Sequence, residues 1–512
     1  MTERERIDLS LLSFFSLFLP FNPLDYCLLI PLKDLMTHRL PLYVPLTIQQ
    51  FSSDGWGQAV WQKSEDKSVL VDVPFTMPGD QVEAELFKSK KGAYQGRLKQ
   101  IIQPSPERVT PRCLHFGSCG GCRWQHVPPT QQLQLKEEGI WQLFAPFIDQ
   151  RTTCYPIIPC TPPWYYRNKM ELTFSSDKHQ QRYLGLIMWG TRGHVFQMKE
   201  CHLVQPWVAQ TAQIVADWWA NSGLEAYNPH RDTGTLRTLT LREGMRTGDR
   251  MVILTVSGHP DYAIHRNQLN TFLAVLQASI HSTQPDQHLS IFLRIQQVAK
   301  GRPTQFYEML LAGPDHIREK MDLVTAGGQI EPLEFRISPS AFFQPNTVQA
   351  EKIYARALAL SQLSSDSLVY DLYCGTGTLG TYLAKQVREV VGIELSPESV
   401  IDAKENIRLN HLNNLSIYTG DVGKILAQWK AEQKPPPDAV MVDPPRVGLD
   451  AQTIRHLLDL NPPCLTYISC NPKTQAANLE AFIKEGYHLQ AIQPVDQFPQ
   501  TIHVENIVVL KR

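Results

Sequence analysis

The stretch Asp371-Leu-Tyr-Cys-Gly-Thr-Gly-Thr-Leu-Gly380 decides the fold of the C-terminal part of the chain. The apolar residues 368–372 predict a buried strand, and the glycines that follow allow a tight turn from this strand into a helix. A second apolar run, residues 390–394, ends at Glu394. This order of strand, turn, helix and strand predicts a doubly wound α/β sheet with parallel strands.

The same alternation continues to the C-terminus. Apolar runs that predict strands lie at residues 416–420, 439–442, 465–469 and 504–510. Ser396 followed by Pro397 is typical of a helix start, with serine as the N-cap and proline in the first turn. We therefore expect residues 336–512 to form one α/β domain of the Rossmann-like class.

The glycine-rich turn and Glu394 also predict a ligand site. Glycines let a ligand approach the backbone closely, and a carboxylate at the end of the second strand can accept hydrogen bonds from both ribose hydroxyls. A nicotinamide dinucleotide site uses the same physics, and a purely structural turn is a further alternative. The order Asp-x-x-Cys-Gly-x-Gly with the later glutamate is similar to the S-adenosylmethionine pocket of class I methyltransferases.

The motif Asp443-Pro-Pro-Arg446 directly follows a predicted strand. Ligands of open α/β sheets bind at this carboxyl edge, and the two prolines stiffen the loop that presents Asp443. Amino-directed methyltransferases use a similar loop that ends in an aromatic residue. Arg446 stands in that place here, which weakens an exocyclic amine as the target.

The motif Ser469-Cys470-Asn471-Pro472 places a cysteine at the end of another strand. A lone cysteine is most often a small buried hydrophobic residue. Beside a methyl-donor pocket a thiolate can instead attack a substrate, and for that the thiol pKa must fall from about 8.5. C5 of a pyrimidine is barely nucleophilic, and cysteine addition at C6 turns it into an enolate that accepts a methyl group.

Glu505 is an unexpected charge in the apolar strand 504–510. A carboxylate within reach of C5 can act as general base and remove the C5 proton before the cysteine is eliminated. A surface glutamate at a strand edge is at least as simple an interpretation. His503 either supports Glu505 or forms structural hydrogen bonds.

The cysteines indicate a metal site. Ten cysteines in 512 residues are too few for a secreted disulfide scaffold. Three of them cluster among glycines: Cys113, Cys119 and Cys122. A distant cysteine must complete such a site, and we expect Cys201 in preference to Cys154 and Cys160. Four thiolates suit zinc or an iron–sulfur cluster equally on physical grounds, and accidental clustering is the remaining alternative.

Residues 41–104 have the pattern of a small β-barrel. Residues 69–73 predict a strand and residues 77–80 a turn. Val82, Ala84 and Leu86 then alternate with polar residues, as in a half-buried strand, and a hairpin tip follows at residues 88–92. From residue 88 to residue 112 seven side chains are basic and one is acidic, and Tyr94 lies among them. A charge run is usually a solvated surface, but this one also suits contact with phosphates and stacking on bases.

The remaining regions are a central α+β stretch, residues 105–335, with a helix expected at 131–147, and an N-terminal extension, residues 1–40. The apolar run 9–32 in the extension is interrupted by Pro20, Asn22 and Pro23, so it predicts neither a signal peptide nor a membrane span. We interpret it as a non-essential extension ahead of an initiator at Met36, with targeting or anchoring as the alternative.

The overall composition excludes a mainly disordered chain, because 43% of the residues are hydrophobic. The 49 basic and 50 acidic residues nearly cancel, so the total charge gives no sign of a nucleic-acid partner. The local basic run at residues 88–112 reverses that inference, because a basic patch is hidden in a neutral total.

These motifs together resemble one family. From about Leu42 to the C-terminus the chain is similar to the bacterial RNA uracil-5-methyltransferases, specifically the 23S ribosomal RNA type with a TRAM domain and a 4Fe-4S cluster. The resemblance rests on the cysteine signature with Gly120-Gly121, on Phe343-Gln-Pro-Asn346, and on the segments 371–380, 443–446, 469–472 and 503–505.

The resemblance implies roles for individual positions. Cys470 would be the nucleophile and Glu505 the base. The S-adenosylmethionine contacts would be Gln344, Tyr373, Glu394 and Asp443. The cluster ligands would be Cys113, Cys119, Cys122 and Cys201, and here the resemblance, not the spacing, favours iron–sulfur over zinc. Residues 41–104 would be an OB-like TRAM barrel that binds RNA, ahead of a central domain with the cluster.

The resemblance also implies an activity and a setting. We expect a cytoplasmic monomer without a membrane partner that makes 5-methyluridine in ribosomal RNA, with transfer RNA as the alternative substrate. A cytosine-5 or amino methyltransferase and a non-catalytic iron–sulfur RNA-binding factor are competing hypotheses. Thr378 stands where many members have asparagine, and residues 1–40 have no counterpart in the family.

Overall fold

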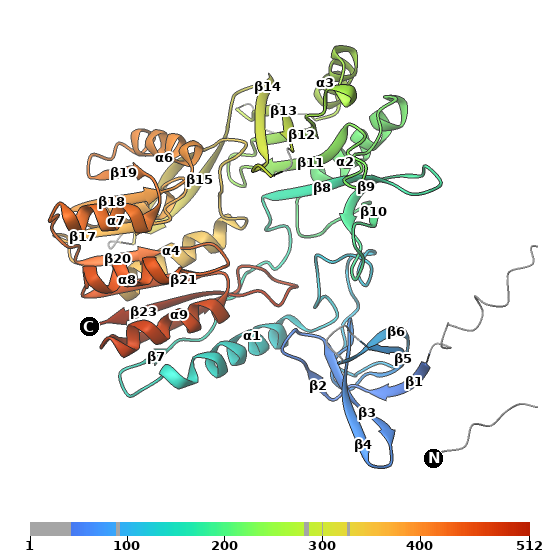
Figure 1. Cartoon of the computed structure of the whole chain (residues 1–512), viewed down its shortest axis with the longest axis horizontal. Helices are drawn as coiled ribbons and strands as arrows, with labels where there is room; N and C mark the ends of the chain where they lie inside the picture. Colours follow the sequence, from blue (N-terminus) through green and yellow to red (C-terminus); the bar gives the residue numbers. More distant parts are fainter. Residues whose placement is uncertain (1–41, 89–92, 281–285, 299–300, 325–327) are drawn as a thin grey trace, which may run out of the picture.

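The computed structural model describes residues 42–512 apart from residues 89–92, 281–285, 299–300 and 325–327. The strands of these residues form four sheets (Figure 1). The expected extension at residues 1–40 and most of the expected hairpin tip at 88–92 lie outside the described residues. No helix of the described part is long and apolar enough to cross a membrane.

An all-β unit stands where the sequence predicts one. Its sheet has the order β1-β5-β6-β4-β3-β2. The strands are β1 (Leu42–Thr47), β2 (Gln50–Phe51), β3 (Gly57–Ser64), β4 (Lys67–Val73), β5 (Gln81–Lys88) and β6 (Tyr94–Gln103). Alternate side chains such as Val82 and Ala84 are fully buried in its own small core. Because β1 lies near β3 as well as beside β5, the sheet curls toward a barrel.

A seven-stranded sheet with the order β10-β9-β8-β11-β12-β13-β14 forms the middle of the molecule. The strands are β8 (Lys169–Ser176), β9 (Arg182–Ile187), β10 (Val195–Gln197), β11 (Leu236–Glu243), β12 (Arg250–Ser257), β13 (Leu289–Gln297) and β14 (Gln305–Ala312). Helices α2 (Pro206–Asn221) and α3 (Arg266–Ser279) pack against it around a shared apolar core, and η3 (Pro260–Tyr262) precedes α3. The pair β12 and β13 is parallel, and its neighbours are antiparallel.

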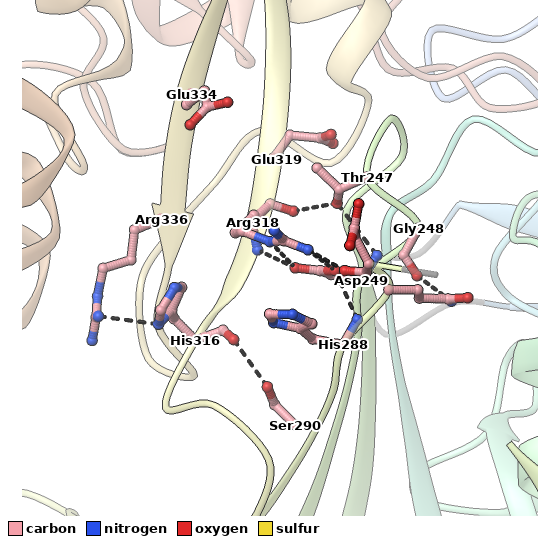
Figure 2. A network of polar contacts seen from close by, with 12 residues as sticks. Thr247, Gly248, Asp249, His288, Ser290, His316, Arg318, Glu319, Glu334 and Arg336 are labelled. Carbon is pink, nitrogen blue, oxygen red and sulfur yellow. Dashed lines mark hydrogen bonds and ion pairs between the residues drawn. The ribbon is translucent and has the colours of Figure 1, made fainter. Parts of the chain in front are cut away.

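A hairpin of β15 (Ile317–Val324) and β16 (Ile330–Ile337) joins this sheet to the C-terminal one. Figure 2 shows the polar network that fixes it. The fully buried carboxylate of Asp249 accepts hydrogen bonds from the backbone N–H groups of His288 and Arg318 and, at 2.9 and 3.0 Å, from the Arg318 guanidinium. Ser290 Oγ donates to the His316 carbonyl at 2.9 Å. The hairpin is therefore held on the seven-stranded sheet by polar contacts.

The C-terminal sheet has the order β19-β18-β17-β20-β21-β23-β22-β7. Its strands are β7 (Thr153–Cys154), β17 (Leu368–Leu372), β18 (Glu389–Glu394), β19 (Leu415–Thr419), β20 (Ala439–Val442), β21 (Cys464–Ser469), β22 (His488–Val495) and β23 (Glu505–Lys511). The expected strands at 368–372 and 439–442 are confirmed at both ends, because a strand buried on both faces is a continuous apolar run bounded by polar residues.

Helices cover both faces of this sheet (Figure 1). One apolar core contains side chains of α4 (Thr347–Ser361), α5 (Thr378–Ala384) and the β15–β16 hairpin, with α6 (Pro397–Leu409) beside it. The other contains side chains of α1 (Pro129–Phe144), α7 (Val422–Ala431), α8 (Ala451–Leu460) and α9 (Pro472–Lys484), with η2 (Ala145–Phe147) after α1. As expected, Ser396 caps α6: its side chain accepts a hydrogen bond from Ser399 N.

The expectation of parallel strands is wrong for the end of the sheet. β23 runs antiparallel to both β21 and β22. Strand direction is not encoded in an apolar run, because both directions bury the same side chains. In addition, α1 and β7 pack on this sheet although their residues lie in the stretch 105–335, ahead of the α/β region in sequence.

Candidate active site

The turn after β17 forms one side of the candidate site. Gly375 and Gly377 have φ angles of +53° and +73°, a left-handed conformation that favours glycine. The backbone N–H of Gly375 donates to Glu394 Oε2 at 3.0 Å, and Ser396 N donates to Glu394 Oε1 at 2.7 Å. A methyl group added to Gly375 would meet no atom within 4 Å. The turn therefore presents bare backbone and an oriented carboxylate to open space.

Asp371 lies beneath this turn in β17. Its side chain is buried, and Oδ2 has no hydrogen-bond partner among the described residues. Burial, together with the nearby charge of Asp443, raises the pKa of Asp371 to about 8. Tyr373, the first residue after β17, has φ +63°. Burial raises the pKa of its hydroxyl, which faces Thr453 of α8. The Tyr373 ring thus packs among the sheet and its helices, while its backbone belongs to the turn.

Gln344 joins three segments at the opposite side of the site. Its Nε2 donates at 3.2 Å to Oδ2 of Asp443, the residue directly after β20. Its Oε1 accepts a hydrogen bond from Gln497 Nε2 at 3.2 Å, and its carbonyl accepts one from Asn168 Nδ2 at 2.8 Å. Burial raises the pKa of Asp443, and the hydrogen bond from Gln344 opposes that rise.

Cys470 and Glu505 meet because β23 is antiparallel to β21. Ser469 at the end of β21 pairs with Asn506 near the start of β23. Cys470, which follows Ser469, and Glu505, which precedes Asn506, therefore lie at the same edge of the sheet. Glu505 is 2% exposed, and its Oε1 has no hydrogen-bond partner among the described residues. Burial, and then the charge of Asp443, raise the pKa of Glu505 well above its usual value.

The thiol of Cys470 is not activated by the protein groups around it. Burial raises its pKa to about 11, the charges of Glu505 and Asp443 act in the same direction, and Arg446 opposes them. This differs from the expected fall in the thiol pKa. The physical reason is that burial disfavours the thiolate and two nearby carboxyl groups add to this effect, whereas Arg446 is the opposing cation.

His503 contacts Arg446. Its Nδ1 lies 3.3 Å from Arg446 Nη2. Burial, and then the charge of Arg446, lower the pKa of His503 to about 4, so the imidazole is neutral near pH 7 and can accept a hydrogen bond from the guanidinium. Of the two roles considered for His503, the observed contact is a structural hydrogen bond to the Asp443–Arg446 loop.

The four cysteines of the expected cluster site line one cavity of about 290 Å³, together with His115 and Phe116. Gly121 N donates to Cys119 Sγ at 3.3 Å, a contact that stabilises a thiolate. Cys154 is exposed in β7, and Cys160 is absent from the lining. Within the described residues no three His, Cys, Asp or Glu side chains are close enough for a single metal ion. Each iron of a cluster binds its own cysteine, so a cluster fits thiols that are farther apart.

Sequence reasoning missed two residues of this edge. Asp421 follows β19 and caps α7, where its side chain accepts a hydrogen bond from Lys424 N at 3.0 Å. The pair Gly420-Asp421 directly after an apolar run was a usable signal. Gln497, which binds Gln344, lies in a loop without a local pattern, so no signal in the sequence indicates it.

The fold and the arrangement of this edge define an α/β methyltransferase-type domain combined with an all-β unit. A solved structure with the same fold is the tRNA (uracil-54, C5)-methyltransferase of Pyrococcus abyssi in complex with S-adenosyl-L-homocysteine. It aligns with a TM-score of 0.66 and 22% identity over 91% of this chain and 99% of the other.

The relatives by sequence are RNA methyltransferases. The family model for tRNA (uracil-5-)-methyltransferases matches residues 289–422 and 433–512. An RNA methyltransferase of Protochlamydia amoebophila is 60% identical over 440 residues, which cover 86% of this chain and 99% of the relative. One from Chlamydia trachomatis is 35% identical over 78% of this chain and 98% of its own length. The chain therefore belongs to the RNA uracil-5-methyltransferase family and is an RNA methyltransferase.

Proposed function

We propose that the protein methylates C5 of a uridine in RNA with S-adenosylmethionine as methyl donor. The observation that carries this proposal is the placement of Cys470 and Glu505 at one edge of the sheet, the edge at which the glycine turn and Glu394 also lie. A nucleophilic sulfur and a general base are the two groups that methylation of an sp² carbon of a pyrimidine requires.

The chain's own groups act in a defined order in this proposal. The Cys470 sulfur, as thiolate, forms a bond to C6 of the uracil, and the electron pair of the C5–C6 double bond moves into the enolate. C5 then takes the methyl group, and the bond between this methyl group and the donor sulfur breaks, which leaves a neutral thioether. The Glu505 carboxylate accepts the C5 proton, the C5–C6 double bond re-forms, and the C6–S bond breaks to release the Cys470 thiolate. The buried Glu505 suits this role because its raised pKa makes it a stronger base than an exposed glutamate.

S-adenosylmethionine supplies an electrophilic methyl group on a sulfonium ion. The residues of the site fit such a donor: Gly375 leaves open space, Glu394 can accept hydrogen bonds from ribose hydroxyls, and Asp371 Oδ2 is an unpaired buried oxygen beside the turn. Gln344 and Asp443 would border the donor on the other side, and Tyr373 would contribute its backbone.

We further propose that the cavity at Cys113, Cys119, Cys122 and Cys201 holds a 4Fe-4S cluster. The support is the donor set, four thiols around one cavity with an N–H group directed at a sulfur. Protein purified without oxygen is expected to be brown and to contain iron. A colourless protein with zinc in the same site would overturn this assignment.

We propose that the all-β unit is a TRAM barrel that binds RNA. Its surface combines cations and aromatic rings: Lys63 and Lys88 lie over Tyr94, with Nζ 5.4 and 5.7 Å from the ring centre, and Lys99 lies 5.3 Å from the centre of Tyr43. Such a surface suits phosphates and stacked bases. We propose 23S ribosomal RNA as the substrate, and transfer RNA is the alternative.

The test uses two unmodified transcripts, 23S ribosomal RNA and transfer RNA, labelled with tritium at uridine C5. Removal of the C5 hydron after methyl transfer releases this tritium into water. Cys470→Ala is expected to abolish release while RNA binding persists, and the matched control Cys154→Ser, at an exposed cysteine, is expected to behave as wild type. Unchanged release from Cys470→Ala contradicts the covalent mechanism. Release from the transfer RNA transcript alone contradicts the ribosomal substrate. No release from either transcript by the wild-type protein favours a non-catalytic RNA-binding factor.

A further inference from the structure

The loop 496–503 joins β22 to β23 and ends just before Glu505. It is polar and yet buried: Asp496, Gln497 and Gln500 are 4%, 0% and 2% exposed. Buried polar groups require hydrogen-bond partners, so the position of this loop depends on the groups that satisfy it. These partners come from segments that lie more than a hundred residues earlier in the chain.

Helix α1 supplies two of them. Lys136 Nζ, fully buried, lies 2.6 Å from Asp496 Oδ1 and donates to the Phe498 carbonyl at 3.0 Å. One turn earlier, Gln132 Oε1 accepts a hydrogen bond from Gln500 N at 3.0 Å, and Gln132 Nε2 donates to Gln500 Oε1 at 3.1 Å. Residues four apart share one face of a helix, so this face of α1 holds the loop at two points.

The cysteine-rich segment holds the same loop through its backbone. Directly after Cys122, the N–H groups of Arg123 and Trp124 donate to the Gln500 carbonyl at 2.9 and 3.1 Å. Gln132 Nε2 also donates to the Trp124 carbonyl at 2.9 Å. Gln500 has φ +68°, a conformation that costs free energy for a residue other than glycine and persists only where its surroundings fix it.

The loop also contacts the proposed cofactor side. Asn346 Nδ2 donates to the Gln497 carbonyl at 3.2 Å, and Gln497 Nε2 donates to Gln344 Oε1 at 3.2 Å. Cys470 is held differently: the neighbouring Asn471 Nδ2 donates to the Arg446 carbonyl at 2.9 Å, outside this loop. His503 of the loop also contacts Arg446, with its Nδ1 3.3 Å from Arg446 Nη2. Because Glu505 begins β23 directly after this segment, a shift of the loop acts on Glu505 through the chain itself, and on Cys470 through the Arg446 contact.

We propose that Gln132 and Lys136 are positioning residues for Glu505: by fixing the loop 496–503 they align this carboxylate with the C5 proton of the substrate. The inference rests on the proposed function, because it assigns Glu505 the role of base. Its consequence is specific. When Gln132 is replaced, addition of Cys470 and methyl transfer proceed, but removal of the C5 proton and release of the thiolate slow down.

The test compares Gln132→Leu with Gln134→Leu, the same substitution on the exposed side of α1. Single-turnover reactions use the tritium-labelled transcript that the wild-type protein methylates. Three quantities are measured: methyl transfer, tritium release, and the covalent protein–RNA adduct on a denaturing gel. Thermal unfolding of each variant reports whether it is folded.

The expected result for Gln132→Leu is a tritium release rate about 10²-fold lower, as for a misplacement near 1 Å, with methyl transfer changed much less and the adduct accumulating. Gln134→Leu is expected to match wild type. A parallel fall of methyl transfer and tritium release without adduct overturns the proposal, because it indicates a general structural role. Tritium release at the wild-type rate from Gln132→Leu also overturns it.

Two further variants keep the test decisive. If Gln132→Leu does not fold, Gln500→Asn takes its place, because asparagine tolerates the left-handed conformation and shortens the side-chain amide. The same accumulation of adduct is expected from it. Glu505→Gln separates the two proposals: when this variant accumulates adduct and the loop variants do not, only the positioning role fails, and when it accumulates none, the role of Glu505 itself fails.

Discussion

The two sides of the candidate site are held in different ways. On the glycine-turn side, both oxygens of Glu394 accept hydrogen bonds from backbone groups of nearby turns, Gly375 N and Ser396 N. On the side of Cys470 and Glu505, Oε1 of Glu505 has no partner among the described residues, and burial raises the pKa of both groups. Under the proposed function, the fixed carboxylate of Glu394 suits binding, and the unpartnered carboxylate of Glu505 suits a reaction.

The largest effect is expected on the reactive side. Glu505→Gln keeps the shape of the side chain and removes its ability to accept a proton. Because general bases contribute about 10²–10⁴-fold, tritium release is expected to fall by this factor, and the Cys470 adduct is expected to accumulate after methyl transfer. The measurement is single-turnover tritium release together with a denaturing gel. Normal release with no adduct contradicts the assignment of Glu505.

A smaller effect, and one of a different kind, is expected on the binding side. Glu394→Gln keeps the length of the side chain and removes the charge that orients the Gly375 turn. Hydrogen bonds to charged groups contribute about 1.5–3 kcal/mol, so the Kd for S-adenosylhomocysteine is expected to rise by about 10-fold to 100-fold. The measurement is titration calorimetry, with the exposed Glu398→Gln as control. Equal affinity of the Glu394 variant and wild type contradicts a cofactor role for this side.

The pH dependence separates the two sides further. The pKa of Cys470 is raised to about 11 and that of Glu505 is raised well above its usual value, and both groups react only when deprotonated. Single-turnover methylation is therefore expected to increase with pH between pH 6 and pH 9, by up to about tenfold per unit where one group titrates. A rate that falls with pH in this range contradicts the unactivated thiol, while Kd for S-adenosylhomocysteine measured in parallel reports the binding side alone.

The same division explains what the sequence can predict. The glycine turn, Glu394 and the start of α6 are local features, so their pattern is visible over a short stretch of residues. The proximity of Cys470 and Glu505 depends on the antiparallel direction of β23, which no apolar pattern contains. The contacts of α1 with the loop 496–503 join residues far apart in sequence, and a single sequence carries no signal for them. Cys201 lies between these two cases. It is distant in sequence from the other three cysteines, but few cysteines were available as the fourth member of that group.

At Asp371, beneath the glycine turn, the expected effect is on stability and not on the reaction. Its folded pKa of about 8 lies above the unfolded value of about 3.9, so the folded state binds the extra proton between these values. The free energy of unfolding therefore falls as pH rises from about 4 to about 8, and at most about 1.4 kcal/mol is lost per unit. Asp371→Asn has no carboxyl group at this position and so does not lose this free energy as pH rises. Its Tm is expected to be higher than that of wild type at pH 8, and the difference is expected to vanish near pH 4. The exposed Asp366→Asn is the control. A difference in Tm that is independent of pH contradicts a neutral, buried Asp371. It would indicate that Asp371 is an ionised carboxylate whose charge is balanced within the site.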